Sequence, residues 1–536
     1  MHFIKTLLRA LNAKELKALI VAFALFSVAG VARIAVAVAE HSEFVPVAGG
    51  SYREGVVGQP VAINPLISNN ATDQDIGALV YSTLYKLLAN YSVEEGGRVF
   101  TVNLKENLKW SDGSPLTSDD VVFTVHTVED PNTRSPFFKN WQGVVAERIS
   151  ELQVRFSLPV PYTFFLENVK RFPIIPKHIF GNIPPANISL SSYNLSPVGS
   201  GPYRFDIFNQ RKDGFITEYR LIPNEFYAGK KPFIKNFSFL FFENEENLLN
   251  AFRLREINGF GSTVPSKNTL PASSQVITER IPMFRYYAVF FNQNNNPVLK
   301  NSDVRKALLL ATPRERIANE VFGGNILSIT GPVFSSSAGE NDFGTYDPEV
   351  ARGLIEKAKL DPMTLNLTTP NIDFMQKTAN ILKQAWEDAG IGTVNVVSMD
   401  PKDTLNMAIK TNNYEALLFG NILENKSDLY PFWHSSQRMY PGLNLSLYQN
   451  SKADTIMENI RQTMDVETIP DMLDALNTTI KKDSPADFLY LVPYVYVHSP
   501  DMQGFSIHGD GGVIANPAER FDNVTEWFVT SARVLK

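Results

Sequence analysis

The sequence of 536 residues contains no cysteine. This absence excludes disulfides, thiolate metal sites, cysteine nucleophiles and a lipid anchor on an N-terminal cysteine. Runs of Lys and Arg are also missing from the body of the chain, and binding to nucleic-acid phosphates needs a basic face. We therefore predict that nucleic acid is not a partner.

Histidine is scarce, and the seven histidines share no local metal-ligand spacing. The sequence holds no H-E-x-x-H and no G-x-x-x-x-G-K, and Gly199-Ser200-Gly201 is not a G-x-S-x-G elbow. We therefore expect no catalytic residue, no metal and no cofactor, and we predict that the protein is not an enzyme. The histidines are His2, His41, His126, His178, His434, His498 and His508.

The first 39 residues are basic and then apolar. They carry five basic residues and one acidic residue, a balance of +4, which leaves −10 for the rest of a chain of net charge −6. The apolar run Ala18–Ala32 is interrupted by Arg33 and resumes at Ile34–Ala39. A helix of the fifteen residues Ala18–Ala32, at about 1.5 Å per residue, is too short to cross a ~30 Å hydrocarbon core. A helix of residues 18–39 is long enough, provided that the Arg33 side chain extends to the membrane surface.

We predict a basic cytoplasmic N-terminus over residues 1–17 and a transmembrane anchor or signal segment over residues 18–39, with the body outside the cytoplasm. The body is then periplasmic or lies at the cell surface, anchored to the membrane unless the segment is cleaved. The competing interpretation is a cleaved signal peptide, for which Ala37-Val38-Ala39 provides a small-residue cleavage site.

The body alternates helical and strand-like patterns. A helix is expected after Asp73, which is a candidate cap, and Thr117 with Asp120 forms a capping box before an apolar run. In the second half, Asp347-Pro348 starts a helix, and an apolar face over Phe374–Ala389 is followed by Gly390 and a strand. This alternation predicts an α/β protein with mixed sheets.

A series of motifs then occurs in a fixed order. The stretch Leu104–Val121, with the letters LKENLKWSDGSPLTSDDV, resembles the most specific signature of the bacterial extracellular solute-binding protein family 5. That family contains the oligopeptide- and dipeptide-binding components of ABC transporters. The other elements that resemble it are Gly55–Leu84, Ile175–His178, Pro197–Tyr203, Phe291-Asn292 with Asp303–Ala307, and Tyr346–Ala351.

The resemblance implies a two-lobe fold like that of periplasmic binding proteins, of the class II or cluster C type, with an inserted subdomain in the N-terminal lobe. We expect the N-terminal lobe to comprise residues 46–92, 196–283 and 500–536, and the inserted subdomain residues 93–195. Residues 284–499 then form the C-terminal lobe. The lobes are expected to close over a ligand in an interlobe cleft.

The function implied is capture of a short peptide and its delivery to the permease subunits of an ABC transporter, by a protein that we expect to be monomeric. Alternatives are another solute (a sugar, an amino-acid conjugate or a metal chelate), a receptor or chaperone-like protein without transport, and, less favoured, a hydrolase. Peptide binding by strand addition needs exposed strand edges. By motif position, Asn69, Asn70 and Ala71 are predicted to supply one edge and Asn421, Ile422 and Leu423 the other.

A carboxylate is expected to bind the amino group of the peptide, because a buried cationic amine needs a partner. Peptide binders of this family carry an aspartate shortly after a Gly-Trp pair in the later lobe. Here Gly420 is kept and the tryptophan is replaced by Asn421. Glu424 and Asp428 are the two acidic residues in this window, and the spacing from Gly420 ranks Glu424 first.

Overall fold

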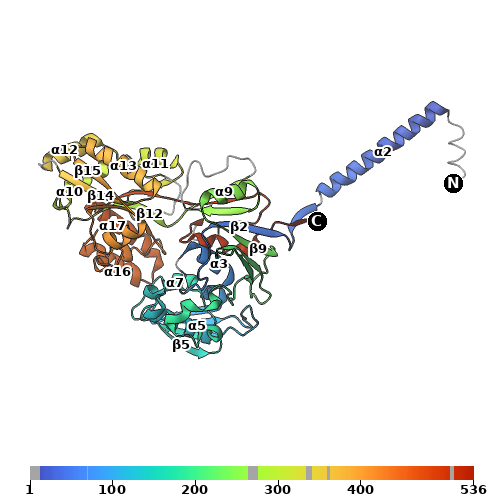
Figure 1. The fold of residues 1–536 in the computed structure, drawn as a ribbon, viewed down its shortest axis with the longest axis horizontal. Coiled ribbons are helices and arrows are strands. Elements are labelled where there is room, and N and C mark those ends of the chain that lie inside the picture. Colours follow the sequence, from blue (N-terminus) through green and yellow to red (C-terminus); the bar gives the residue numbers. More distant parts are fainter. Residues whose placement is uncertain are drawn as a thin grey trace.

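The structure is a computed structural model that describes residues 12–40, 42–68, 70–263, 276–333, 341–358, 363–507 and 512–535. It consists of two α/β lobes, a smaller subdomain at their junction, and a long helix that projects from the first lobe (Figure 1). His2, His41, His508 and the predicted ligand residue Asn69 lie outside the described residues.

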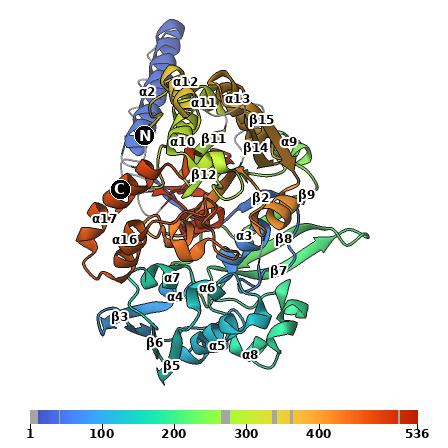
Figure 2. The same ribbon diagram turned by 90° about the vertical axis from the view of Figure 1, so that its left-hand side faces the viewer.

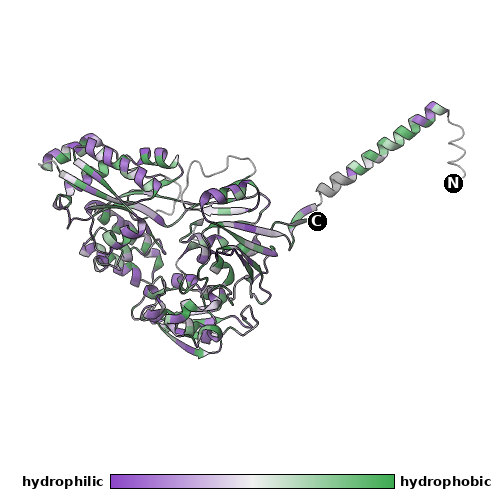
Figure 3. Cartoon of the chain, viewed as in Figure 1, coloured by the Kyte–Doolittle hydropathy of each residue, from purple (hydrophilic) through white to green (hydrophobic). Residues whose placement is uncertain are grey.

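The projecting helix is α2 (Ala13–Glu40), which continues through Arg33 without a break. Figure 3 shows that most of it is hydrophobic. A two-stranded antiparallel ribbon follows, in which β1 (Ser42–Pro46) pairs with β19 (Ser531–Leu535) from the other end of the chain. The first and last segments of the body therefore lie side by side where they extend from it.

The first lobe contains a seven-stranded sheet in the order β11-β18-β10-β2-β9-β8-β7. The central strand β2 runs parallel to β9 and β10, and the other pairs are antiparallel, so the sheet is mixed. The strands and helices of this lobe are β2 (Ser51–Val57), α3 (Ala71–Val80), β7 (Tyr203–Gln210), β8 (Ile216–Pro223), β9 (Asn236–Phe242), α9 (Glu245–Arg253), β10 (Gly259–Ser262), β11 (Ile277–Ile281) and β18 (Tyr494–His498).

The inserted subdomain is built on a four-stranded antiparallel sheet, β3-β4-β6-β5. Its core includes Trp141, whose ring stacks on Phe172 at a centroid distance of 3.8 Å. Its elements are α4 (Leu84–Leu87), β3 (Leu88–Glu94), β4 (Val99–Leu104), α5 (Ser118–Glu129), α6 (Phe138–Trp141), β5 (Val145–Ser150), β6 (Gln153–Ser157), α7 (Phe165–Arg171) and α8 (Lys177–Phe180).

Three of the family motifs lie against one another where the subdomain meets the first lobe. The Ser111 N–H donates to the Gly199 carbonyl at 2.8 Å, and the His178 ring nitrogen lies 2.8 Å from Asp112 Oδ2. Gly199 is required because a Cβ there would lie 2.1 Å from the carbonyl oxygen of Val80. These motifs therefore hold the scaffold together.

The second lobe contains a six-stranded sheet in the order β13-β17-β12-β16-β14-β15, with helices on both faces (Figure 2). Alternate residues of β12 enter the two opposite cores. The elements are β12 (Arg285–Phe291), α10 (Ser302–Leu310), α11 (Arg314–Phe322), β13 (Leu327–Ser328), α12 (Pro348–Ala358), β14 (Met363–Pro370), α13 (Asp373–Asp388), β15 (Gly392–Met399), α14 (Pro401–Asp403), β16 (Ala416–Ile422), α15 (Tyr430–Trp433), α16 (Ser451–Gln462), α17 (Ile469–Asp483) and β17 (Ala486–Leu491).

Two adjacent chain segments connect the lobes. β11 pairs with β18 in the first sheet, and their continuations β12 and β17 pair in the second. Each crossing contains a proline, Pro282 in one and Pro493 in the other, and proline has no N–H with which to continue a ladder. The ladders therefore stop between the lobes, as a hinge requires.

The strand pairing shifts two predicted boundaries. β18 lies in the first lobe's sheet, although residues 284–499 were assigned to the C-terminal lobe, because its hydrogen bonds go to β10 and β11. The subdomain sheet begins at Leu88 rather than at residue 93, because β3 pairs with β4.

A buried ion cluster joins the last segment of the body to the first. Arg520, which is 1% exposed, lies 2.8 Å from Glu54 on β2 and 2.6 Å from Asp75 on α3. The Tyr496 hydroxyl donates to Glu54 at 2.8 Å. Burial raises the pKa of Glu54, and the positive charge of Arg520 opposes this effect. Arg520 therefore neutralises acids from two distant parts of the sequence.

Candidate functional site

Strand β16 has a partly unpaired side. It pairs along its full length with β12, whereas β14 pairs with it only at Ala416 and Leu417. Within the described part of the chain, residues 418–422 therefore have no strand partner on the β14 side. Because successive peptide groups of a strand point to opposite sides, about half of those in this stretch face away from β12. This is the edge that was predicted to receive a peptide backbone.

The three predicted residues at this edge differ in what their side chains do. Ile422 is 50% exposed, whereas Asn421 and Leu423 are buried. The Asn421 amide donates to the Tyr286 hydroxyl at 3.0 Å, and the Leu423 N–H donates to the carbonyl of Phe284 at 2.7 Å. Of the three, only Ile422 has an exposed side chain.

The other predicted edge is the start of a helix. Asn70 is the N-cap of α3 and accepts from the Asp73 N–H at 2.8 Å, and Ala71 is the exposed first residue. The prediction that Asn70 and Ala71 form a strand edge is therefore wrong in its local structure, because an asparagine in this position caps a helix. Asp73, which was expected to be the cap, instead accepts from the N–H groups of residues 61–62 at 2.8 and 3.0 Å.

The two candidate carboxylates have different surroundings. Asp428 is 8% exposed and forms two hydrogen bonds with the Arg461 guanidinium, at 2.8 and 2.7 Å. Glu424 is exposed, and its carboxylate accepts from the Asn140 amide at 2.6 Å. Among the described residues, no cation lies within ion-pair distance of Glu424. Asp428 is already neutralised, whereas Glu424 retains an unpaired charge.

The same region connects the subdomain to the second lobe. The Tyr162 hydroxyl donates to Asp428 Oδ2 at 2.9 Å, and the Thr163 N–H donates to the Arg461 carbonyl, in the last turn of α16, at 2.7 Å. Phe164 is 7% exposed and packs in the second lobe's core. We call residues 162–164, with Asp428 and Arg461, the interlobe latch.

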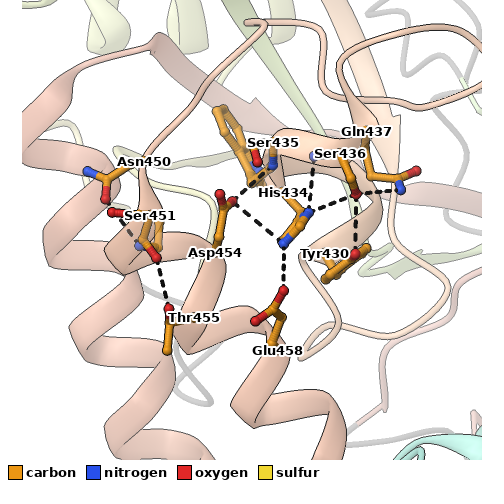
Figure 4. Close-up of polar contacts among 12 residues, drawn as sticks. Tyr430, His434, Ser435, Ser436, Gln437, Asn450, Ser451, Asp454, Thr455 and Glu458 are labelled. Carbon is orange, nitrogen blue, oxygen red and sulfur yellow. Dashed lines mark hydrogen bonds and ion pairs between the residues drawn. The ribbon is translucent and has the colours of Figure 1, made fainter. Parts of the chain in front are cut away.

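A polar network supports the second-lobe side of the latch (Figure 4). The Ser436 N–H donates to His434 Nδ1 at 3.1 Å, so the neutral ring carries its proton on Nε2, which faces Glu458 at 3.3 Å. The His434 ring stacks on Tyr430 at 3.9 Å, and the Arg461 guanidinium lies 4.0 Å from the same tyrosine ring. The network therefore positions Tyr430, and Tyr430 supports Arg461.

Arg285 is a residue of this region that the sequence analysis missed. It begins β12 opposite Ile422, and its buried Nε has no hydrogen-bond partner within the part of the chain that the structure describes. Its guanidinium donates to the carbonyl of Thr263 at 3.2 Å and lies 5.6 Å from the Tyr287 ring. No carboxylate among the described residues forms an ion pair with it. One basic residue at the head of an otherwise apolar strand was the signal in the sequence.

Among the described residues, no three His, Asp or Glu side chains come together as a metal site requires.

Comparison with known protein families identifies the chain. The model of the bacterial extracellular solute-binding proteins, family 5 (Middle), matches residues 83–440. The chain belongs to this family. Family 5 solute-binding proteins with similar sequences include the oligopeptide-binding protein AppA of Bacillus subtilis, which is 23% identical over 551 aligned positions that cover 92% of this chain and 94% of AppA. The glutathione-binding protein GsiB of Escherichia coli is 23% identical over 477 positions, covering 84% and 90%.

Solved structures of family 5 solute-binding proteins have the same fold. The ABC transporter substrate-binding protein CtaP of Listeria monocytogenes superposes with a TM-score of 0.78 at 25% identity, covering 90% of this chain and 99% of CtaP. B. subtilis AppA in complex with a nonapeptide gives a TM-score of 0.70 at 22% identity, covering 91% and 100%. The predicted family and the predicted two-lobe α/β fold are confirmed.

Proposed function

We propose that this chain captures short peptides between its two lobes and delivers them to the permease subunits of an ABC transporter. The observation that carries the proposal is the unpaired side of β16 at residues 418–422, followed directly by the carboxylate of Glu424. A strand edge binds a peptide backbone of any sequence, and a carboxylate at its end binds the amino terminus. The names of AppA and of its nonapeptide complex support this ligand class. The role is binding alone, without catalysis.

Glu424 is the group that we propose for the peptide amine. Its carboxylate has no cationic partner among the described residues, whereas Asp428 is held by Arg461. Breaking a desolvated charge pair between protein and ligand costs about 2–5 kcal/mol. Glu424→Gln should therefore weaken peptide binding by this amount and leave the melting temperature of the empty protein unchanged.

Calorimetric titration with a peptide and with its N-acetylated form tests this role. Acetylation should weaken binding to the wild type and should have little further effect on Glu424→Gln. Glu349→Gln is the matched control, because Glu349 is a 78% exposed side chain elsewhere on the second lobe. Equal affinity of Glu424→Gln and the wild type for the free peptide would place the amine elsewhere.

Arg285 is the second group that we propose for the ligand. Arg285 lies at the start of β12, opposite Ile422 on the paired side of β16. Its guanidinium has no carboxylate partner in the described chain, so it can pair with a ligand carboxylate. Mass spectrometry of ligand released from natively purified protein tests the solute class. Peptides of mixed sequence support the proposal, whereas a single sugar, amino-acid conjugate or metal chelate replaces it.

We further propose that α2 anchors the protein in the membrane with the body outside. The segment Ala13–Arg33 has a mean hydropathy of 1.9 and no buried residue, and at about 1.5 Å per residue it spans the hydrocarbon core. A mature protein that retains Met1 supports the anchor. A new N-terminus near Glu40 identifies a cleaved signal instead.

A further inference from the structure

The ribbon of β1 and β19 lies between α2 and the body (Figure 1). It joins the body through the Val47 N–H, which donates to the Thr530 carbonyl at 3.0 Å. No described side chain of either strand is fully buried. An isolated two-stranded ribbon is only marginally stable in water. The ribbon is therefore a structure that a further surface would stabilise.

One face of the ribbon combines an aromatic residue with a cation. The register places Phe44 opposite Arg533, so both side chains lie on the same face, and the guanidinium is 5.6 Å from the ring centroid. Phe44 is 71% exposed. Arg533 Nε donates to the Ser42 hydroxyl at 2.6 Å, and no carboxylate of the described chain forms an ion pair with Arg533. Segments that lie on a membrane surface combine Phe, Trp or Leu side chains, which enter the boundary layer, with Lys or Arg, which attract anionic lipids.

The short distance along the chain between α2 and the ribbon indicates which surface the ribbon contacts. α2 ends at Glu40 and β1 begins at Ser42. Phe44 is the fourth residue after Glu40, a separation of at most about 14 Å of extended chain. The headgroup layer on each side of a bilayer is roughly 5–8 Å thick. If the apolar residues 18–39 of α2 lie within the membrane, Glu40 lies at its outer edge, and the chain is then short enough for Phe44, with Arg533 beside it, to contact the lipid headgroups.

We propose that the Phe44 and Arg533 face of the ribbon lies on the outer surface of the membrane that α2 crosses. Arg533 contacts lipid phosphates, and the Phe44 ring enters the interfacial layer. The proposal rests on the anchor proposed above. Because β19 is the C-terminal strand, both ends of the body are then held at the membrane, which fixes the orientation of the two lobes relative to a permease.

The test uses tryptophan fluorescence of the full-length protein in vesicles of phosphatidylcholine and phosphatidylglycerol whose acyl chains carry bromine close to the headgroups. Phe44→Trp should lose its added emission in brominated vesicles relative to plain ones. Leu190→Trp, 80% exposed on the subdomain, should keep its emission. The emission of the native tryptophans should be the same in brominated and plain vesicles, because all five are buried: Trp110, Trp141, Trp386, Trp433 and Trp527.

Two further variants test the face and the charge. Val534→Trp should be quenched less than Phe44→Trp, because the register places Val534 opposite Glu43 on the other face. Arg533→Gln in the Phe44→Trp background should reduce the quenching in anionic vesicles. If the emission of Phe44→Trp is not quenched although the protein resists extraction by carbonate, the ribbon proposal is overturned and the anchor proposal stands. Extraction of the wild type by carbonate overturns the anchor itself.

Discussion

Tyr162→Phe tests the interlobe latch with the smallest possible change. It removes the hydroxyl that donates to Asp428 at 2.9 Å and leaves the ring and the Asp428–Arg461 pair in place. A hydrogen bond to a charged group contributes about 1.5–3 kcal/mol net. Tyr162 is only half-buried, so both groups regain water when the lobes separate, and we take the lower value, about 1.5 kcal/mol. The ratio of closed to open molecules should therefore fall roughly tenfold.

The assay uses the absence of native cysteine. Two introduced cysteines, Leu190→Cys on the subdomain and Val350→Cys on the second lobe, carry a dye pair at exposed positions. Energy transfer in the empty protein should decrease in Tyr162→Phe. Tyr193→Phe, which removes a hydroxyl within the subdomain, should match the wild type. Unchanged transfer and unchanged ligand affinity in Tyr162→Phe would refute the role of this hydrogen bond in closure.

Three other predictions concern stability and the ligand. Arg520→Met should destabilise the protein by about 3–5 kcal/mol, measured by urea unfolding, because Glu54 and Asp75 lose their buried cation. Burial lowers the pKa of His498, whose Nε2 has no hydrogen-bond partner among the described residues. The contribution of His498 to stability is therefore present above its unfolded pKa and lost as the pH falls through its folded pKa. The melting temperature of the wild type should therefore drop more than that of His498→Asn between pH 7.5 and 5, and equal drops would contradict this. Arg285→Met should weaken the binding of a peptide with a free carboxylate more than that of its amidated form, and an equal loss for both peptides would exclude the pairing.

Local structure in this chain follows from local sequence. The Thr117–Asp120 capping box, the helix that starts after Asp347, and the helix ended by Gly390 are all present. Each depends on residues within a few positions of one another. Asp73 shows the limit of prediction from local sequence. Asn70 and Asp73 are both able to cap the same helix, and in the structure Asn70 is the N-cap.

The remaining errors concern long-range choices. The pattern of Tyr494–His498 is typical of a buried strand, but the sequence does not indicate which lobe's sheet this strand joins. The candidate window with Glu424 and Asp428 was visible in the sequence. The pairing of Asp428 with Arg461 and Tyr162 was not, because one partner lies 33 residues away and the other 266.

The buried cluster of Arg520 has a consequence for biogenesis. Glu54 and Asp75 precede Arg520 by 466 and 445 residues, so both acids leave the ribosome long before their cation is synthesised. The second lobe's sheet, in contrast, comes from the continuous stretch 285–491 and is complete earlier. The sheet of the first lobe, which begins with β2, therefore stays incomplete until β18 has been synthesised and is the last of the two to be completed.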